Sequence, residues 1–149
     1  MRTEYETEAD LKREYDFRKR IEAKFKVGLY KLHQSMRMDF LMHRRMEPIA
    51  FVETKCRNND LMQYPDLMLS ANKWEAGVLW TKHASSVFDQ GKLLFLIFIS
   101  AFDGDWQYCY KPHHSKEIVL KHSGRTTQTR DVWDKELCVH IPTKFFKKF

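Results

Sequence analysis

Apolar residues recur at helical spacing near the start of the chain. At 3.6 residues per turn, one face of this segment carries Leu11, Phe17, Ile21 and Phe25. Charged residues fill most of the other positions. The pattern predicts a helix over residues 8–26, and Gly28 follows as a C-terminal signal. A second helix is predicted over residues 67–84, where one face carries Leu67, Ala71, Trp74 and Val78.

The other apolar segments have the length of strands. They cover residues 29–33, 37–43, 49–57, 93–101, 118–120 and 137–141. The segment "HRRMEP" is read as a hairpin connection, and Asp103-Gly104 as a second hairpin turn. The run "KLLFLIFISAF" is continuously apolar, as in the centre of a sheet. The order of these elements predicts an α/β fold with a mixed central β-sheet flanked by helices.

Composition narrows this picture. The chain has 149 residues, of which 43% are hydrophobic, so one domain with a real core is expected. The longest apolar run is too short to span a membrane, and the charged N-terminus does not read as a signal peptide. A cytoplasmic protein without disulfides is therefore expected from its three scattered cysteines. The net charge of +6 points to a polyanionic partner such as a nucleic acid.

The strand "IAFVETKCR" is interrupted by Glu53 and Lys55, which share one face of the strand. A hairpin turn centred on Met46 places Asp39 directly opposite Glu53, with Cβ atoms about 5 Å apart. Two facing carboxylates repel each other unless a cation such as Mg²⁺ or Mn²⁺ compensates them. Lys55 would then act on a water or on a phosphate. The alternative is an ordinary cross-strand salt bridge on a solvated face.

The first helix carries two further candidate carboxylates. Glu14 falls in the middle of the apolar arc, and Glu22 lies about a quarter-turn from its centre. A charged residue on an apolar face needs a buried partner. That partner is either the proposed metal site or an arginine.

Asp39, a hairpin and "FVETK", preceded by an acidic helix and followed by a helix and a strand, resemble the PD-(D/E)XK nuclease superfamily. The resemblance covers roughly residues 10–110 and is strongest to small phage-encoded members. It implies a restriction-endonuclease-like or resolvase-like core and a metal-dependent DNA endonuclease. Asp39 and Glu53 would bind the metal, Lys55 would assist the attacking water, and Glu14 would complete the site. Met38 stands where the superfamily name has proline.

DNA contacts are expected from several basic residues, each of which could equally be ordinary surface charge. They are Arg44, Arg45, Arg57, Lys73, Arg125 and Arg130, and Ser70 is a polar candidate beside Lys73. Paired cutting would make a homodimer possible. If the chain is phage-encoded, the host cytoplasm is its expected location. The rival function is a non-catalytic nuclease-fold module that binds DNA or protein.

Overall fold

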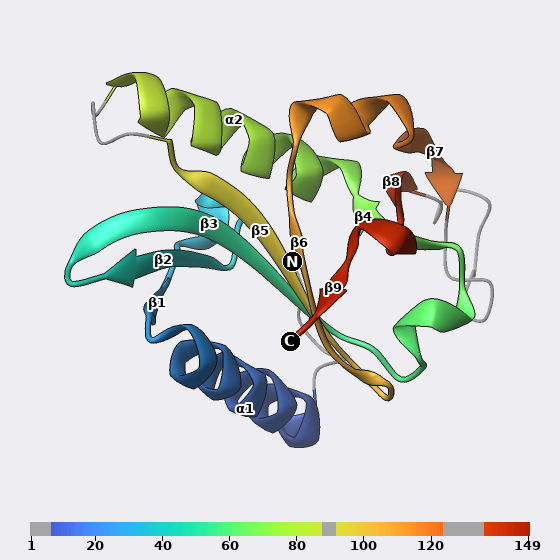
Figure 1. Cartoon of the computed structure of the whole chain (residues 1–149), viewed down its shortest axis with the longest axis horizontal. Coiled ribbons are helices and arrows are strands. Elements are labelled where there is room, and N and C mark those ends of the chain that lie inside the picture. The colour runs from blue at the N-terminus through green and yellow to red at the C-terminus, as the bar shows by residue number, and fades with distance from the viewer. Residues whose placement is uncertain (1–6, 88–91, 124–135) are drawn as a thin grey trace.

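The computed structural model describes residues 7–87, 92–123 and 136–149 (Figure 1). Two long helices and nine strands form the described part of the chain. They are α1 (Glu8–Phe25), β1 (Gly28–Lys31), β2 (Phe40–Arg44), β3 (Glu47–Cys56), β4 (Asp66–Ser70), α2 (Ala71–Val87), β5 (Leu94–Ala101), β6 (Gly104–Cys109), β7 (Val119–Ser123), β8 (Glu136–Pro142) and β9 (Lys147–Lys148). Neither helix is long and apolar enough to cross a membrane, within the residues that the structure describes.

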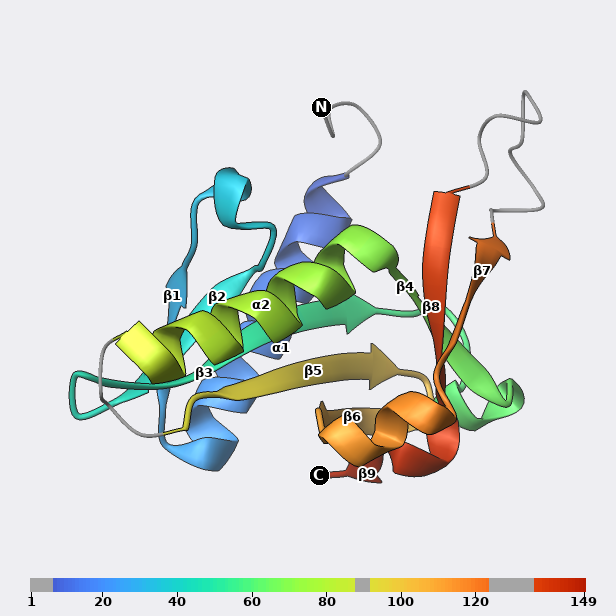
Figure 2. The same cartoon turned by 90° about the horizontal axis from the view of Figure 1, so that it is seen from above.

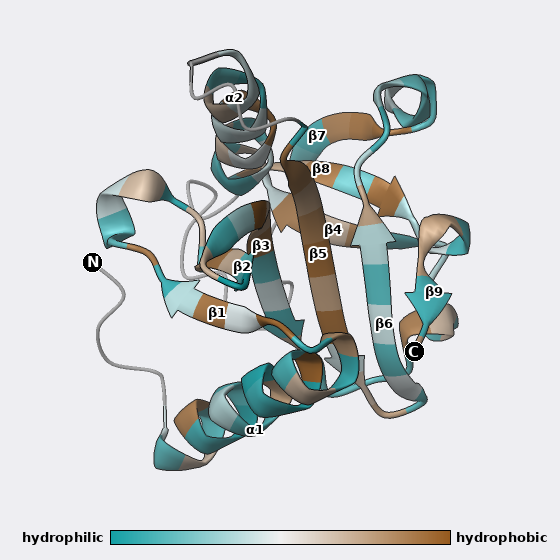
Figure 3. Cartoon of the chain, turned by 60° about the vertical axis from the view of Figure 1, so that its left-hand side comes forward, coloured by the Kyte–Doolittle hydropathy of each residue, from teal (hydrophilic) through white to brown (hydrophobic). Residues whose placement is uncertain are grey.

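The main sheet has six strands in the order β1-β2-β3-β5-β6-β9. β3 and β5 run parallel, and the other neighbours are antiparallel, so the sheet is mixed as predicted. The continuously apolar β5 lies in its interior, which explains why it needs no polar face (Figure 3). A second, three-stranded sheet has the order β4-β8-β7 (Figure 2).

The two helices cover opposite faces of the main sheet (Figure 1). On one face, Phe17 and Ile21 of α1 pack with Val52 and Phe98 in one apolar cluster. On the other face, a second cluster joins Phe51 and Ile97 to α2 and to the second sheet. Alternate residues of β3 therefore enter two different environments, which makes the side that each residue faces decisive for function.

α2 lies close to the sheet because Gly77 has no side chain. A Cβ atom built there would lie 2.4 Å from Cζ of Phe95 on β5. Lys73 precedes Gly77 by one helical turn and so shares its sheet-facing side. This close approach carries Lys73 toward β3.

Two sequence-based predictions about elements were wrong. Residues 66–70 form strand β4 rather than the first turn of a helix, because Leu67 and Leu69 alternate into the core and the strand pairs with β8. The partner strand lies about seventy residues away, beyond the reach of local periodicity. The left-handed residue that ends α1 is Lys26, whereas Gly28 begins β1, where a Cβ would lie 2.3 Å from Cε1 of His43.

The β2–β3 hairpin places Asp39 beside Glu53 as predicted, although its turn is not centred where the sequence suggested. Its two turn residues are Arg45 and Met46, both with positive φ, so the turn centre lies half a residue earlier than expected. A bulge beside Met42 restores the register, and Phe40 pairs with Val52. Asp39 and Glu53 then occupy the next positions along the two chains.

Candidate functional site

Asp39 and Glu53 lie beside each other at one end of the β2–β3 hairpin, on the face of the sheet that α2 covers. Asp39 directly precedes β2, and Glu53 lies near the carboxyl end of β3. Glu53 is only 1% exposed, and the side chain of Asp39 is largely buried. The structure thus brings the two predicted carboxylates into one buried cluster.

The ammonium group of Lys73 lies between these carboxylates. Its Nζ is 3.5 Å from Oδ1 of Asp39 and 3.3 Å from Oε2 of Glu53. The side chain is 16% exposed, so it is not the solvated surface lysine that was one interpretation of the sequence. One carboxylate directly before β2 and one on β3 therefore converge on one positive charge.

Asp39 is held as an anion by its neighbours. The backbone N–H and the hydroxyl of Thr54 both donate to its Oδ2, at 3.0 and 3.2 Å, and Nζ of Lys31 lies 4.0 Å from Oδ1. Burial alone would raise the pKa of Asp39. The charge of Lys73 and the Thr54 N–H outweigh that penalty, with help from Lys31 and Lys55, and lower the pKa.

Glu53 has the opposite electrostatic balance. Burial and the negative charge of Asp39 raise its pKa to about 7, although Lys73 and Lys55 partly offset both effects. In the metal-free protein near neutral pH, the pair therefore consists of an ionised Asp39 and a Glu53 that is close to half protonated. Two carboxylates with separated pKa values are typical of functional sites.

Lys55 lies next to Glu53, as the strand alternation predicts. Its Nζ is 3.8 Å from Oε1 of Glu53, and its side chain is 23% exposed. It therefore contacts the carboxylate cluster from a more solvent-accessible position than Lys73. A substrate phosphate that approaches the two carboxylates would meet this ammonium group.

The helix carboxylates do not join this cluster. Glu14 is exposed on α1, which packs against the opposite face of the sheet, so the expectation that it sits centrally on the apolar face was wrong. Its charge helps to raise the pKa of Cys56, after the larger effect of burial. Glu22 instead accepts a hydrogen bond from the Leu29 N–H at 3.1 Å and lies 3.7 Å from Arg18.

The predicted DNA-contact residues fall in different places. Arg57 lies just beyond β3 and donates to the carbonyl oxygen of Met68 at 3.2 Å. Arg44 and Arg45 lie at the turn end of the hairpin, about 20 Å along β3 from Glu53. Ser70 is the last residue of β4, directly before α2. Arg125 and Arg130 lie outside the described residues.

Sequence reasoning missed two residues of the cluster. Thr54, the middle residue of the Glu-x-Lys motif, fixes Asp39 through two hydrogen bonds. Lys31 reaches Asp39 because it pairs with Phe40 across β1 and β2. The position of Thr54 inside the motif was a usable signal. The position of Lys31 required the β1–β2 register, which the sequence does not state.

The donor set fits a hard divalent cation. Carboxylate oxygens are preferred ligands of Mg²⁺, which commonly takes only one or two of them and completes its shell with waters and substrate phosphates. Across residues 7–87, 92–123 and 136–149, no group of three or more His, Cys, Asp or Glu side chains is placed to hold a metal. Asp39 and Glu53 would thus supply two ligands to an ion that also binds solvent and substrate.

Comparison with protein families matches the whole chain, residues 1–149, to a family described as "Phage putative PDDEXK endonuclease". Comparisons with curated proteins and with solved structures gave no match. The letters PDDEXK in the family description denote the motif to which Asp39, Glu53 and Lys55 were assigned from the sequence. The chain therefore belongs to this phage PD-(D/E)XK family and has its restriction-endonuclease-like α/β fold.

Proposed function

We propose that the protein is a Mg²⁺-dependent endonuclease that hydrolyses phosphodiester bonds of DNA. The observation that carries the proposal is the convergence of Asp39 and Glu53 on a single positive charge, the Lys73 ammonium group. Buried carboxylates gathered around one cation indicate a place where a divalent metal ion can replace that cation. Family membership supports a nucleic-acid substrate.

Each residue of the cluster has a distinct role in this proposal. Asp39 and Glu53 hold the metal ion, and Thr54 orients Asp39 through its N–H and hydroxyl groups. A divalent ion held there would supply positive charge to the phosphate and make a nearby water more acidic. Lys55 stabilises the negative charge that develops on the phosphate and positions the attacking water. Lys31, at the exposed rim, attracts the DNA backbone.

The direct test combines metal binding with cleavage. Mn²⁺ at a hundredfold excess over its dissociation constant is expected to raise the melting temperature by roughly 5–10 °C. Purified protein should cut DNA with Mg²⁺ or Mn²⁺ and should not cut with EDTA. Metal-induced stabilisation without cleavage of any DNA substrate would instead favour a non-catalytic DNA- or protein-binding module. Cleavage that is unaffected by EDTA would contradict the proposal.

Lys73→Met should strengthen metal binding, because the ammonium group and the metal ion compete for the same two carboxylates. At pH 8.5 we expect the Mn²⁺ dissociation constant, measured by calorimetry, to fall by about tenfold or more. The metal-free variant should be less stable, since the paired carboxylates lose their counter-charge.

The control for this variant is Lys82→Met, which removes an exposed lysine from the same helix. It should leave the Mn²⁺ dissociation constant unchanged. If Lys73→Met weakens Mn²⁺ binding instead, Lys73 supports the metal site rather than competing for it.

A further inference from the structure

A pocket of ≈ 340 Å³ lies between the segment that follows β3 and strand β4. Its lining includes Arg57, Asn59, Tyr64, Pro65, Asp66 and Met68. Oδ1 of Asp66 lies 3.1 Å from Nδ1 of His140. The volume falls in the range of pockets that hold small organic groups. None of the residues proposed to bind the metal belongs to this lining.

The pocket adjoins the carboxylate cluster. Arg57 follows Lys55 by two residues, and its N–H donates to the Ser100 carbonyl at 2.8 Å, so the extended pairing of β3 continues this far. The two residues are thus about 7 Å apart along the strand and emerge on the same side. On the other wall, β4 leads directly into the helical turn that carries Lys73.

The lining has the chemistry of a site for a nucleobase. Tyr64, Pro65 and Met68 present an aromatic ring and apolar surface, on which the flat face of a base can stack. The guanidinium group of Arg57 can stack on a base as well, and its orientation is fixed by the Met68 carbonyl. The Asn59 amide nitrogen donates to the Asp60 carbonyl at 2.7 Å, and its second N–H and its oxygen can pair with the edge of a base.

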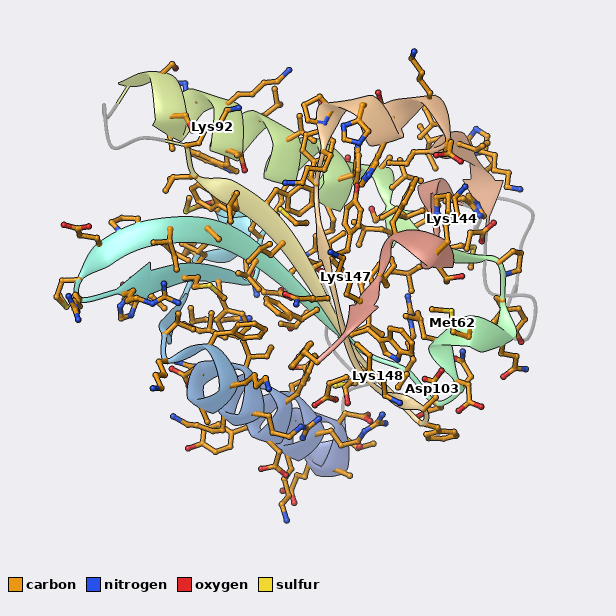
Figure 4. The ribbon with its side chains drawn as sticks, in the orientation of Figure 1. Met62, Lys92, Asp103, Lys144, Lys147 and Lys148 are labelled. Atoms are coloured by element: carbon orange, nitrogen blue, oxygen red, sulfur yellow. The ribbon has the colours of Figure 1, made fainter. Side chains whose placement is uncertain are left out.

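The pocket is also built in advance. Asp103 accepts hydrogen bonds from the N–H groups of Leu61 and Met62, at 2.9 and 3.4 Å, and lies beside Met62 in Figure 4. On the other side of the loop, the buried hydroxyl of Thr143 donates to the Tyr64 carbonyl at 3.0 Å. A loop held at both ends costs little ordering entropy when a ligand binds.

We propose that this pocket receives one unpaired base of the DNA substrate, from a nucleotide next to the phosphate that is cut. The inference rests on the proposed function and names its substrate class. A base stacked inside a duplex cannot enter a lateral pocket without leaving its stack. The enzyme therefore prefers DNA with a single-stranded nucleotide beside the scissile bond over continuous duplex.

The test measures binding in EDTA, where no cleavage occurs, to a fluorescein-labelled single strand and to the same sequence as a duplex. The wild type should bind the single strand more tightly. Tyr64→Ala should weaken single-strand binding by at least about fivefold and leave duplex binding unchanged. Tyr64→Phe should keep the wild-type affinities, because the ring is retained.

Tyr15→Ala is the matched control, since Tyr15 is 56% exposed and Tyr64 is 55% exposed, but Tyr15 lies on α1. It should change neither affinity. A 2-aminopurine placed beside the cut site should lose fluorescence on binding to the wild type and regain it with Tyr64→Ala. Equal losses for single strand and duplex in Tyr64→Ala, or no preference of the wild type for single strands, would overturn the inference.

These outcomes separate the inference from the function on which it rests. Metal-dependent cleavage of duplex and single-stranded DNA at equal rates would leave the nuclease proposal intact and contradict the role of the pocket in binding an unpaired base. If the protein cleaves no DNA but still prefers single strands in binding, the nuclease proposal is contradicted and the base-binding pocket is supported.

Discussion

Glu53→Gln is expected to abolish Mn²⁺-induced stabilisation and DNA cleavage while making the metal-free protein more stable at pH 8. The variant removes one of the two proposed metal ligands, so the ion loses half of its protein donors. It also removes a buried negative charge that Asp39 repels. Loss of function together with a gain in stability is the signature of a site arranged for a cation.

The size of the gain follows from the pKa of Glu53. Folding raises this pKa from 4.5 to about 7, so the folded state holds the proton more tightly than the unfolded chain. The contribution of Glu53 to the free energy of unfolding therefore falls as the pH rises from about 4.5 to about 7, by roughly 3 kcal/mol. Glu53→Gln should be more stable than the wild type above pH 7 by up to about this amount.

Asp39→Asn is the matched variant, and its stability is expected to change in the opposite direction. It should also lose the metal response, but it should lower stability by about 1–3 kcal/mol, because its pKa is lowered by favourable contacts with Lys73 and Thr54. From the sequence alone, relief of repulsion predicts that both variants gain stability. The structure assigns the strain to Glu53 and the favourable contacts to Asp39.

Urea titrations in EDTA at pH 5 and pH 8, followed by Mn²⁺ melting curves, measure both effects. The Asp39 contribution is lost as the pH falls from the ordinary Asp pKa of 3.8 to the lowered pKa of the folded state, so this loss does not overlap the Glu53 range. A Glu53→Gln variant that keeps the full Mn²⁺ response would show that the ion binds elsewhere. Equal stability of this variant and the wild type at pH 8 would show that Glu53 carries no electrostatic strain.

Most of what the sequence predicted correctly depends on local patterns. The alternation of β3 put Glu53 and Lys55 on one face, and the apolar run of β5 predicted its interior position. The predicted neighbourhood of Asp39 and Glu53 was correct only because two shifts offset each other. The turn is centred half a residue earlier than expected, and the bulge beside Met42 restores the register. A register argument across a hairpin without glycine or asparagine in its turn is therefore less secure than its outcome here suggests.

What the sequence missed, and what it left open for Lys73, depends on contacts between distant segments. Lys73 reaches the carboxylates because Gly77 lets α2 approach Phe95, and no local pattern states which strand the helix will cross. β4 was taken as helix because its partner β8 is far along the chain. Glu14 was placed on the buried face by an idealised helical wheel, whereas the buried residues of α1 are Phe17 and Ile21.

Lys55→Met should separate chemistry from metal binding. Nζ of Lys55 lies 3.8 Å from Oε1 of Glu53 and its side chain is partly exposed, whereas Lys73 lies between both carboxylates. We therefore expect the variant to bind Mn²⁺ and DNA with nearly wild-type affinity, while its single-turnover cleavage rate falls by about 10²–10⁴-fold. Loss of Lys55 removes a charge that lowers the pKa of Glu53. The measurements are therefore made at pH 8.5, where Glu53 stays ionised in the variant as well.

Lys31→Met is the matched comparison, because Lys31 is also a lysine near the cluster but is mostly exposed and lies 4.0 Å from Asp39. Its loss should weaken DNA binding and reduce its dependence on salt, with little effect on the rate at saturating DNA. If Lys55→Met and Lys31→Met slow cleavage equally at saturation, Lys55 contributes only general positive charge. A rate loss confined to Lys55→Met, with metal affinity retained, places its ammonium group at the reacting phosphate.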